Sequence, residues 1–92
     1  MPKFLELRSS NPLRRGTEVL RFEIDLEQPA EVCVRLIGTA GQVVAELANG
    51  KFPAGEQIQV ANLEGRRLAA GVYFLEARSG RRRQAIPLVV IP

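Results

Sequence analysis

Strict alternation of apolar and polar residues over residues 17–26 is the feature that most constrains the fold of this chain. One face carries Leu20, Phe22, Ile24 and Leu26, and the other carries Arg21, Glu23 and Asp25. Because successive side chains of a strand point to opposite faces, this period of two predicts a strand with one buried and one solvated face. No window offers helical apolar spacing over the roughly 10 to 12 residues that a stable helix needs. We therefore expect an all-β chain.

Turn-forming residues divide the rest of the chain into short segments of the same kind. Beside residues 17–26, we expect strands at about residues 4–7, 31–37, 42–47, 57–61, 72–78 and 83–91. The turns between them include Gly38-Thr39-Ala40-Gly41, Asn49-Gly50 and Phe52-Pro53-Ala54-Gly55. Short strands with turn signals about every 8 to 12 residues are typical of an immunoglobulin-like antiparallel β-sandwich of about seven strands in two sheets. At 92 residues, we expect one such domain over residues 4–92, preceded by a linker or added start at residues 1–3.

Tyr73, the only tyrosine, begins the strand that follows Gly71. Period two places Tyr73, Leu75 and Ala77 on a core-like face, and Val72, Phe74, Glu76 and Arg78 on a mixed one. A tyrosine at this place can bury its ring and donate its hydroxyl to nearby backbone, the tyrosine corner of immunoglobulin-like sandwiches. The alternative is a half-buried tyrosine whose hydroxyl lies in water.

Pro87 interrupts the last strand. Because proline cannot donate to a β-ladder, we expect it at a sheet edge, at a bulge or on the unpaired side of its strand.

Charge and composition argue against several classes of function. The apolar fraction of 46% and the charged fraction of 25% are those of an ordinary globular domain. Thirteen basic and 10 acidic residues give a net charge of +3, and outside Arg81-Arg82-Arg83 they are interspersed, so we do not expect nucleic-acid binding. No apolar run approaches the roughly 20 residues of a spanning helix, and we expect no membrane insertion. Cys33 is the only cysteine and excludes an internal disulfide.

The residue types that carry chemistry are sparse. The chain has no histidine, so we expect no Ser-His or Cys-His catalytic arrangement and no His-ligated metal site. Glu23 and Asp25 are interpreted as charges on a solvated strand face. Phosphate-binding glycine loops and calcium loops are missing, and we expect no catalytic residue, cofactor or metal. Phe52 and Phe74 are the two aromatic residues on which a sugar could stack if this were a carbohydrate-binding module.

Several landmarks occur in an order that resembles a known family. They are Ser10-Asn11-Pro12-Leu13, residues 20–24, residues 32–44, Pro53-Ala54-Gly55-Glu56 and residues 68–74. Together they are similar to the FlgD Ig-like family, especially to the C-terminal sorting domain of type IX secretion cargo. The resemblance implies a sandwich at the end of a longer exported protein, secreted or on the cell surface after passing the periplasm. It also implies recognition by an outer-membrane export receptor or surface-attachment machinery, often followed by cleavage.

Matched residue by residue, Asn11 and Pro12 correspond to the family's Pro-Asn-Pro motif, with Ser10 in place of the first proline. Gly71 and Tyr73 match its corner. The family commonly has a lysine before its final apolar run, whereas Pro87 precedes that run here.

These patterns lead to three hypotheses of different classes. The first is a non-catalytic sorting domain, attached to an upstream parent cargo domain and contacting its receptor through Arg81, Arg82, Arg83, Leu88, Val89, Val90 and Ile91. Its rationale is that a terminal edge strand offers unpaired backbone for strand addition and that arginines offer charge steering. The second is a structural or adhesive spacer, as in hook-capping scaffolds or surface proteins. The third is a carbohydrate-binding module.

Overall fold

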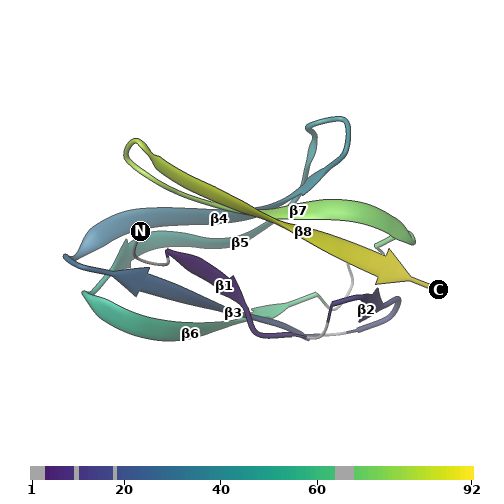
Figure 1. Ribbon diagram of the computed structural model, residues 1–92, viewed down its shortest axis with the longest axis horizontal. Helices are drawn as coiled ribbons and strands as arrows, with labels where there is room; N and C mark the ends of the chain where they lie inside the picture. The colour runs from purple at the N-terminus through teal and green to yellow at the C-terminus, as the bar shows by residue number, and fades with distance from the viewer. Residues whose placement is uncertain (1–3, 10, 18, 64–67) are drawn as a thin grey trace.

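Eight strands in two sheets make up the described part of the chain, residues 4–9, 11–17, 19–63 and 68–92 of the computed structural model. Figure 1 shows the two sheets stacked face to face. The three-stranded sheet has the order β1-β3-β6, with β1 at Leu5–Leu7, β3 at Val19–Leu26 and β6 at Gly55–Asn62. The five-stranded sheet has the order β2-β8-β7-β4-β5, with β2 at Leu13–Arg14, β4 at Ala30–Gly38, β5 at Val43–Phe52, β7 at Gly71–Ser79 and β8 at Arg82–Ile91. The predicted all-β sandwich is confirmed, with the two-residue β2 as an additional strand.

The core lies between the two sheets and is built from alternate positions of their strands. Every residue that is predicted to face inward in β3 and β4 is buried. Those residues are Leu20, Phe22, Ile24 and Leu26 of β3 and Val32, Val34 and Leu36 of β4. Leu75 and Ala77 of β7 and Leu88 and Val90 of β8 complete the same layer. Because period two is a local property of the sequence, it indicates correctly which side chains face inward.

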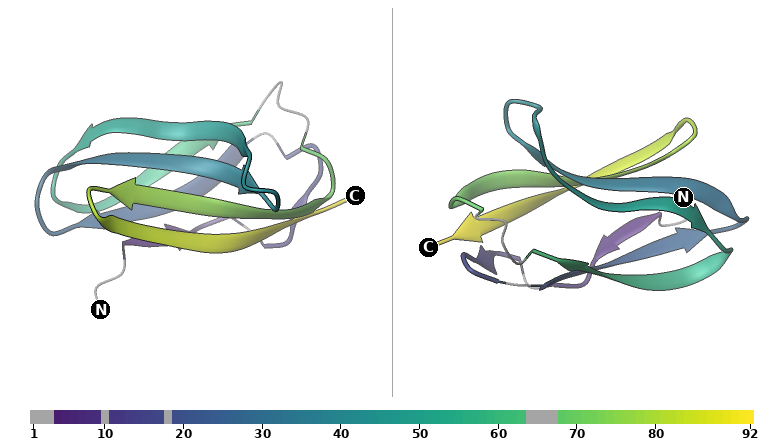
Figure 2. Two further views of the ribbon diagram at one scale, coloured as in Figure 1. Left: turned by 90° about the horizontal axis from the view of Figure 1, so that it is seen from above. Right: turned by 180° about the vertical axis from the view of Figure 1, so that it is seen from behind.

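The chain passes repeatedly from one sheet to the other. It changes sheet at every connection from β1 to β4 and again between β5 and β6 and between β6 and β7, while the hairpins β4–β5 and β7–β8 stay within the five-stranded sheet. Figure 2, seen from above, shows β5, β4, β7 and β8 side by side across that sheet. The corner predicted at Phe52-Pro53-Ala54-Gly55 is the β5–β6 crossing.

The prediction of a turn at Asn49-Gly50 is wrong. β5 continues through both residues to Phe52, and Asn49 and Gly50 pair with Cys33 and Val32 of β4. Two register shifts in this pair bend the hairpin without ending it. Asn-Gly is a strong turn signal locally, but here the ladder with β4 keeps these residues extended.

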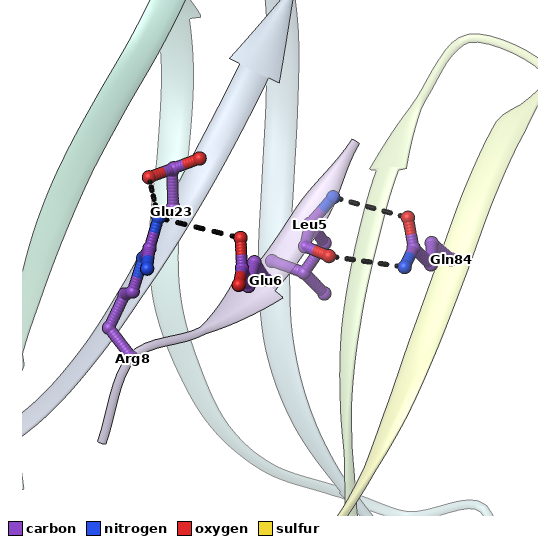
Figure 3. Close-up of polar contacts among 5 residues, drawn as sticks. All are labelled: Leu5, Glu6, Arg8, Glu23 and Gln84. Carbon is purple, nitrogen blue, oxygen red and sulfur yellow. Dashed lines mark hydrogen bonds and ion pairs between the residues drawn. The ribbon is translucent and has the colours of Figure 1, made fainter. Parts of the chain in front are cut away.

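Glu23 is also placed differently from its predicted position on a solvated face. It is 6% exposed, because Arg8 just beyond β1 covers it and donates from Nη2 to its Oε1 at 2.6 Å (Figure 3). The same guanidinium lies 3.5 Å from a carboxylate oxygen of Glu6. The hydrogen bond to Glu23 is the main cause that raises the pKa of Arg8 above its usual range. Asp25 on the same face is half-buried, and Arg21 is exposed.

One side of the sandwich is closed by a side chain of β8. The Gln84 amide accepts a hydrogen bond from the Leu5 N–H and donates one to the Leu5 carbonyl oxygen, both at 3.1 Å (Figure 3). The carbonyl oxygen of Phe4 accepts from the N–H of Asp25 of β3. Because backbone groups alternate in direction along a strand, the N–H and C=O of the next residue, Leu5, point away from β3. The amide of Gln84 therefore pairs with the outer edge of β1 as a short strand would.

Candidate protein-interaction surface

The outer face of the five-stranded sheet carries a continuous group of apolar side chains, all of them exposed except the half-buried Ile37. Val43, Ile37, Phe74 and Pro87 lie in one row across β5, β4, β7 and β8, since each is the register partner of the next. Val72 and Val89 pair in the adjoining row. We call these six residues the apolar patch. Four of them are among the most exposed large apolar side chains, with Val43 51% exposed, Val72 44%, Val89 37% and Phe74 36%.

Exposed apolar residues that stand singly on a surface are ordinary, whereas a contiguous group is typical of a binding site. The patch crosses four strands of a rigid sheet, so a partner would meet a preformed surface. The two hairpin turns, β4–β5 and β7–β8, rise on this outer side at opposite ends of the sheet (Figure 1).

A row of charged residues borders the patch. Arg35 of β4 and Glu76 of β7 are register partners, and Arg35 Nη2 donates to Glu76 Oε1 at 2.9 Å. Arg83 Nη1 lies 4.0 Å from the other oxygen of Glu76. The hydrogen bond to Glu76 raises the pKa of Arg35, so this guanidinium stays charged. Glu76 is only 8% exposed, which the sequence did not indicate for a position on the mixed face.

The three consecutive arginines do not form one patch. Arg82 points toward the inner side of β8 and places its guanidinium 4.7 Å from the centre of the Phe4 ring, a cation–π contact at the end of the core. Arg83 points to the outer face beside Glu76. Arg81 is exposed in the β7–β8 turn. Of the exposed arginines near this turn, Arg83 lies on the outer face, where Arg78 pairs with it in the ladder.

The closing strand β8 has two kinds of position. Leu88 and Val90 are buried, so their side chains form part of the core in the folded domain and do not face a partner. Val89 is exposed and Ile91 is half-buried. Of the four apolar residues predicted to contact a receptor, Val89 alone belongs to the apolar patch.

The predicted motif residue Asn11 clamps the outer edge of β8. Its Nδ2 donates to the carbonyl oxygen of Pro87 at 3.0 Å, and its Oδ1 accepts from the N–H of Val89 at 3.1 Å. β2, which follows directly after Pro12, continues this contact by pairing in parallel with Val90 and Ile91. The side chain of Asn11 thus takes the place of a strand residue. The prediction that the closing strand is an open edge strand is therefore wrong, because β2 and Asn11 occupy the outer side of β8.

The same contact explains how Pro87 fits within a strand. Because its carbonyl oxygen points toward Asn11, its nitrogen also points away from β7. The missing N–H therefore removes no ladder bond with β7, and the prediction that Pro87 lies on the unpaired side is confirmed.

The tyrosine corner is confirmed as well. Tyr73 Oη donates to the carbonyl oxygen of Ala69 at 2.6 Å, and its half-buried ring packs against the core. Gly71 lies between them with φ +154°, a conformation that L side chains rarely adopt. The corner fixes the start of β7, and hence the positions of Val72 and Phe74.

The remaining candidate residues do not come together. Phe52 is half-buried at the β5–β6 corner and packs against the core, whereas Phe74 is exposed on the outer face, so they form no common platform. Cys33 is a half-buried free thiol. Among the described residues, no three Asp, Glu, Cys or His side chains are grouped so that they could hold a metal ion.

Sequence reasoning missed the apolar patch, although one signal was present. Period two assigns Val72 and Phe74 to a mixed face of their strand, but it does not say which residues of other strands lie beside them. Only the register of β4, β5, β7 and β8 brings the six residues together.

Comparison with known proteins finds no match to a family model, to a curated protein or to a solved structure. The resemblance to the FlgD Ig-like family therefore stays a prediction. Within the described residues, no helix is long and apolar enough to cross a membrane.

Proposed function

We propose that this chain is a non-catalytic protein-recognition domain that directs a parent protein to the cell surface through an export receptor. The observation that carries the proposal is the apolar patch, which lies on a rigid sheet beside the closing strand. Such a surface suits a protein partner better than a small molecule, because it is spread over four strands.

The sorting role rests on the resemblance and is supported by where its motif residues lie. Asn11 clamps the closing strand and Tyr73 fixes the start of its neighbour, so both motifs position the two strands that carry four of the six patch residues. Arg78, Arg81 and Arg83 at the other end of the face favour a partner that combines apolar side chains with carboxylates.

The test fuses the domain to the C-terminus of a reporter that carries a signal peptide, in a bacterium with a type IX secretion system. We expect the reporter at the cell surface. Deleting β8 would remove core residues and unfold the domain, so a point variant is preferable. Val72→Lys changes an exposed patch residue and is expected to leave the reporter in the periplasm. Val60→Lys, a change of the same kind at an exposed residue of the other sheet, is the control and should be exported normally.

Two results would count against the proposal. A wild-type fusion that stays in the periplasm would favour the spacer hypothesis. Normal export of a folded Val72→Lys fusion would show that the receptor does not use the apolar patch.

A further inference from the structure

The exposed edges of the two sheets are protected to very different degrees. The outer edge of β1 is paired by the Gln84 amide, and that of β8 by Asn11 and β2. β5 forms the other edge of the five-stranded sheet, and its ladder with β4 contains two register shifts. Among the described residues, β6 pairs with β3 along all eight of its positions, and no strand pairs with its other edge. Native proteins usually block such an edge with bulges, prolines or inward charges, and β6 has none of these.

The side chains on β6 are unusual for an exposed edge strand. Ile58 and Val60 are 53% and 59% exposed, the largest exposures among the large apolar residues of the described chain. Both lie on the outer face of the three-stranded sheet, opposite Glu23 and Arg21 of β3. They contribute nothing to the core in this position. Pairing with another strand would cover part of the apolar surface of both side chains.

The direction of the backbone groups on β6 follows from the ladder on its other side. The backbone groups of Arg21 and Asp25 of β3 bond to the β1 segment, so by alternation Phe22 and Ile24 turn their N–H and C=O toward β6. Phe22 thus exchanges both bonds with Gln59. The N–H and C=O groups of Ile58 and Val60 therefore point outward, on the edge where their side chains are also exposed.

We propose that β6 is a self-association edge, on which a second copy of this chain adds its own β6 in antiparallel orientation about a two-fold axis through Gln59. In that register Ile58 lies opposite Val60 of the second copy. The pair exchanges two backbone hydrogen bonds, and the two-fold axis repeats it. The two three-stranded sheets then become one continuous six-stranded sheet.

A second copy is favoured over another occupant because β6 is complementary to itself. Glu56 lies opposite Asn62 of the second copy and Gln57 lies opposite Ala61, so no like charges face each other. The β-branched side chains at residues 58 and 60 pack as cross-strand pairs on one face. The interface is small, so we expect a weak dimer that forms with increasing concentration.

Sedimentation velocity of the whole chain, from about 10 µM to about 1 mM, tests the proposal. The wild type should shift from monomer toward dimer across this range. Val60→Lys places charges at the two-fold junction and should weaken the association at least about tenfold. Val72→Lys, on the other sheet, should leave it unchanged. A monomer at every concentration would overturn the proposal, as would an association that Val60→Lys leaves intact.

A cross-linking experiment tests the register independently of the affinity. Gln59→Cys in a Cys33→Ser background brings the two thiols together at a non-hydrogen-bonded antiparallel pair, within disulfide distance. We expect an intermolecular disulfide with this variant and none with Glu56→Cys, whose counterpart lies six residues away along the partner strand. Equal cross-linking of the two variants would reject the proposed pairing. Since neither experiment involves export, a failure here is distinguishable from a failure of the sorting proposal.

Discussion

Replacing Asn11 by alanine gives the sharpest test of how the closing strand is held. The substitution removes two hydrogen bonds, one to the Pro87 carbonyl oxygen at 3.0 Å and one from the Val89 N–H at 3.1 Å. A net hydrogen bond contributes about 0.5 to 1.5 kcal/mol. Because both contacts are exposed, water can replace the lost partners, and we expect a fall in unfolding free energy of about 1 to 2 kcal/mol. For a domain of this size that lowers Tm by about 5 to 15 °C.

Urea and thermal denaturation measure the loss, and amide hydrogen exchange locates it. The Val89 amide should exchange faster in Asn11→Ala, while the amide of Leu88, which points toward β7, should change much less. A loss below about 0.3 kcal/mol with unchanged exchange at Val89 would refute the clamp.

Asn11→Asp separates the two bonds. The carboxylate still accepts from the Val89 N–H but cannot donate to Pro87, and its second oxygen lies against a carbonyl oxygen. Folding therefore disfavours the ionised form and raises the pKa of the new carboxyl. With a raised folded pKa, the variant should gain stability relative to wild type as the pH falls through about 4. The opposite trend would show that the side chain does not face Pro87 O in solution.

Three further predictions concern other contacts of the fold. Tyr73→Phe should lower the unfolding free energy by about 1 kcal/mol, measured by urea denaturation, because it removes the bond to Ala69; an unchanged value would reject the corner. Gln84→Ala should speed hydrogen exchange at the Leu5 amide more than at the other amides of its strand, and equal exchange would contradict the edge pairing. Because the pKa of Arg35 is raised in the folded state, its guanidinium stabilises the fold at every pH below the usual arginine range, and this contribution is lost only above that range. The difference in unfolding free energy between wild type and Arg35→Gln should therefore stay constant from about pH 7 to about pH 10. A difference that shrinks within that range would contradict the raised pKa.

The candidate site was predictable only in part. The motif residues Asn11 and Tyr73 were singled out from sequence, and both make long-range or corner contacts that hold β8 and β7. Arg81, Arg82 and Arg83 were treated as one cationic run, but alternation along the β7–β8 hairpin sends Arg82 and Arg83 to opposite faces. The same period of two that identified the strand could have separated them.

The sequence by itself determined the class of fold and the inward faces of β3, β4 and β7, because alternation and turn chemistry act over a few residues. Only the tertiary structure decided which strands lie next to one another. Pairing between distant segments kept Asn49 and Gly50 in a strand, covered Glu23 with Arg8 and brought the six residues of the apolar patch together from four strands. It also left one edge of β6 without a partner strand in the described chain. These features depend on residues far apart in sequence, whose proximity no local pattern records.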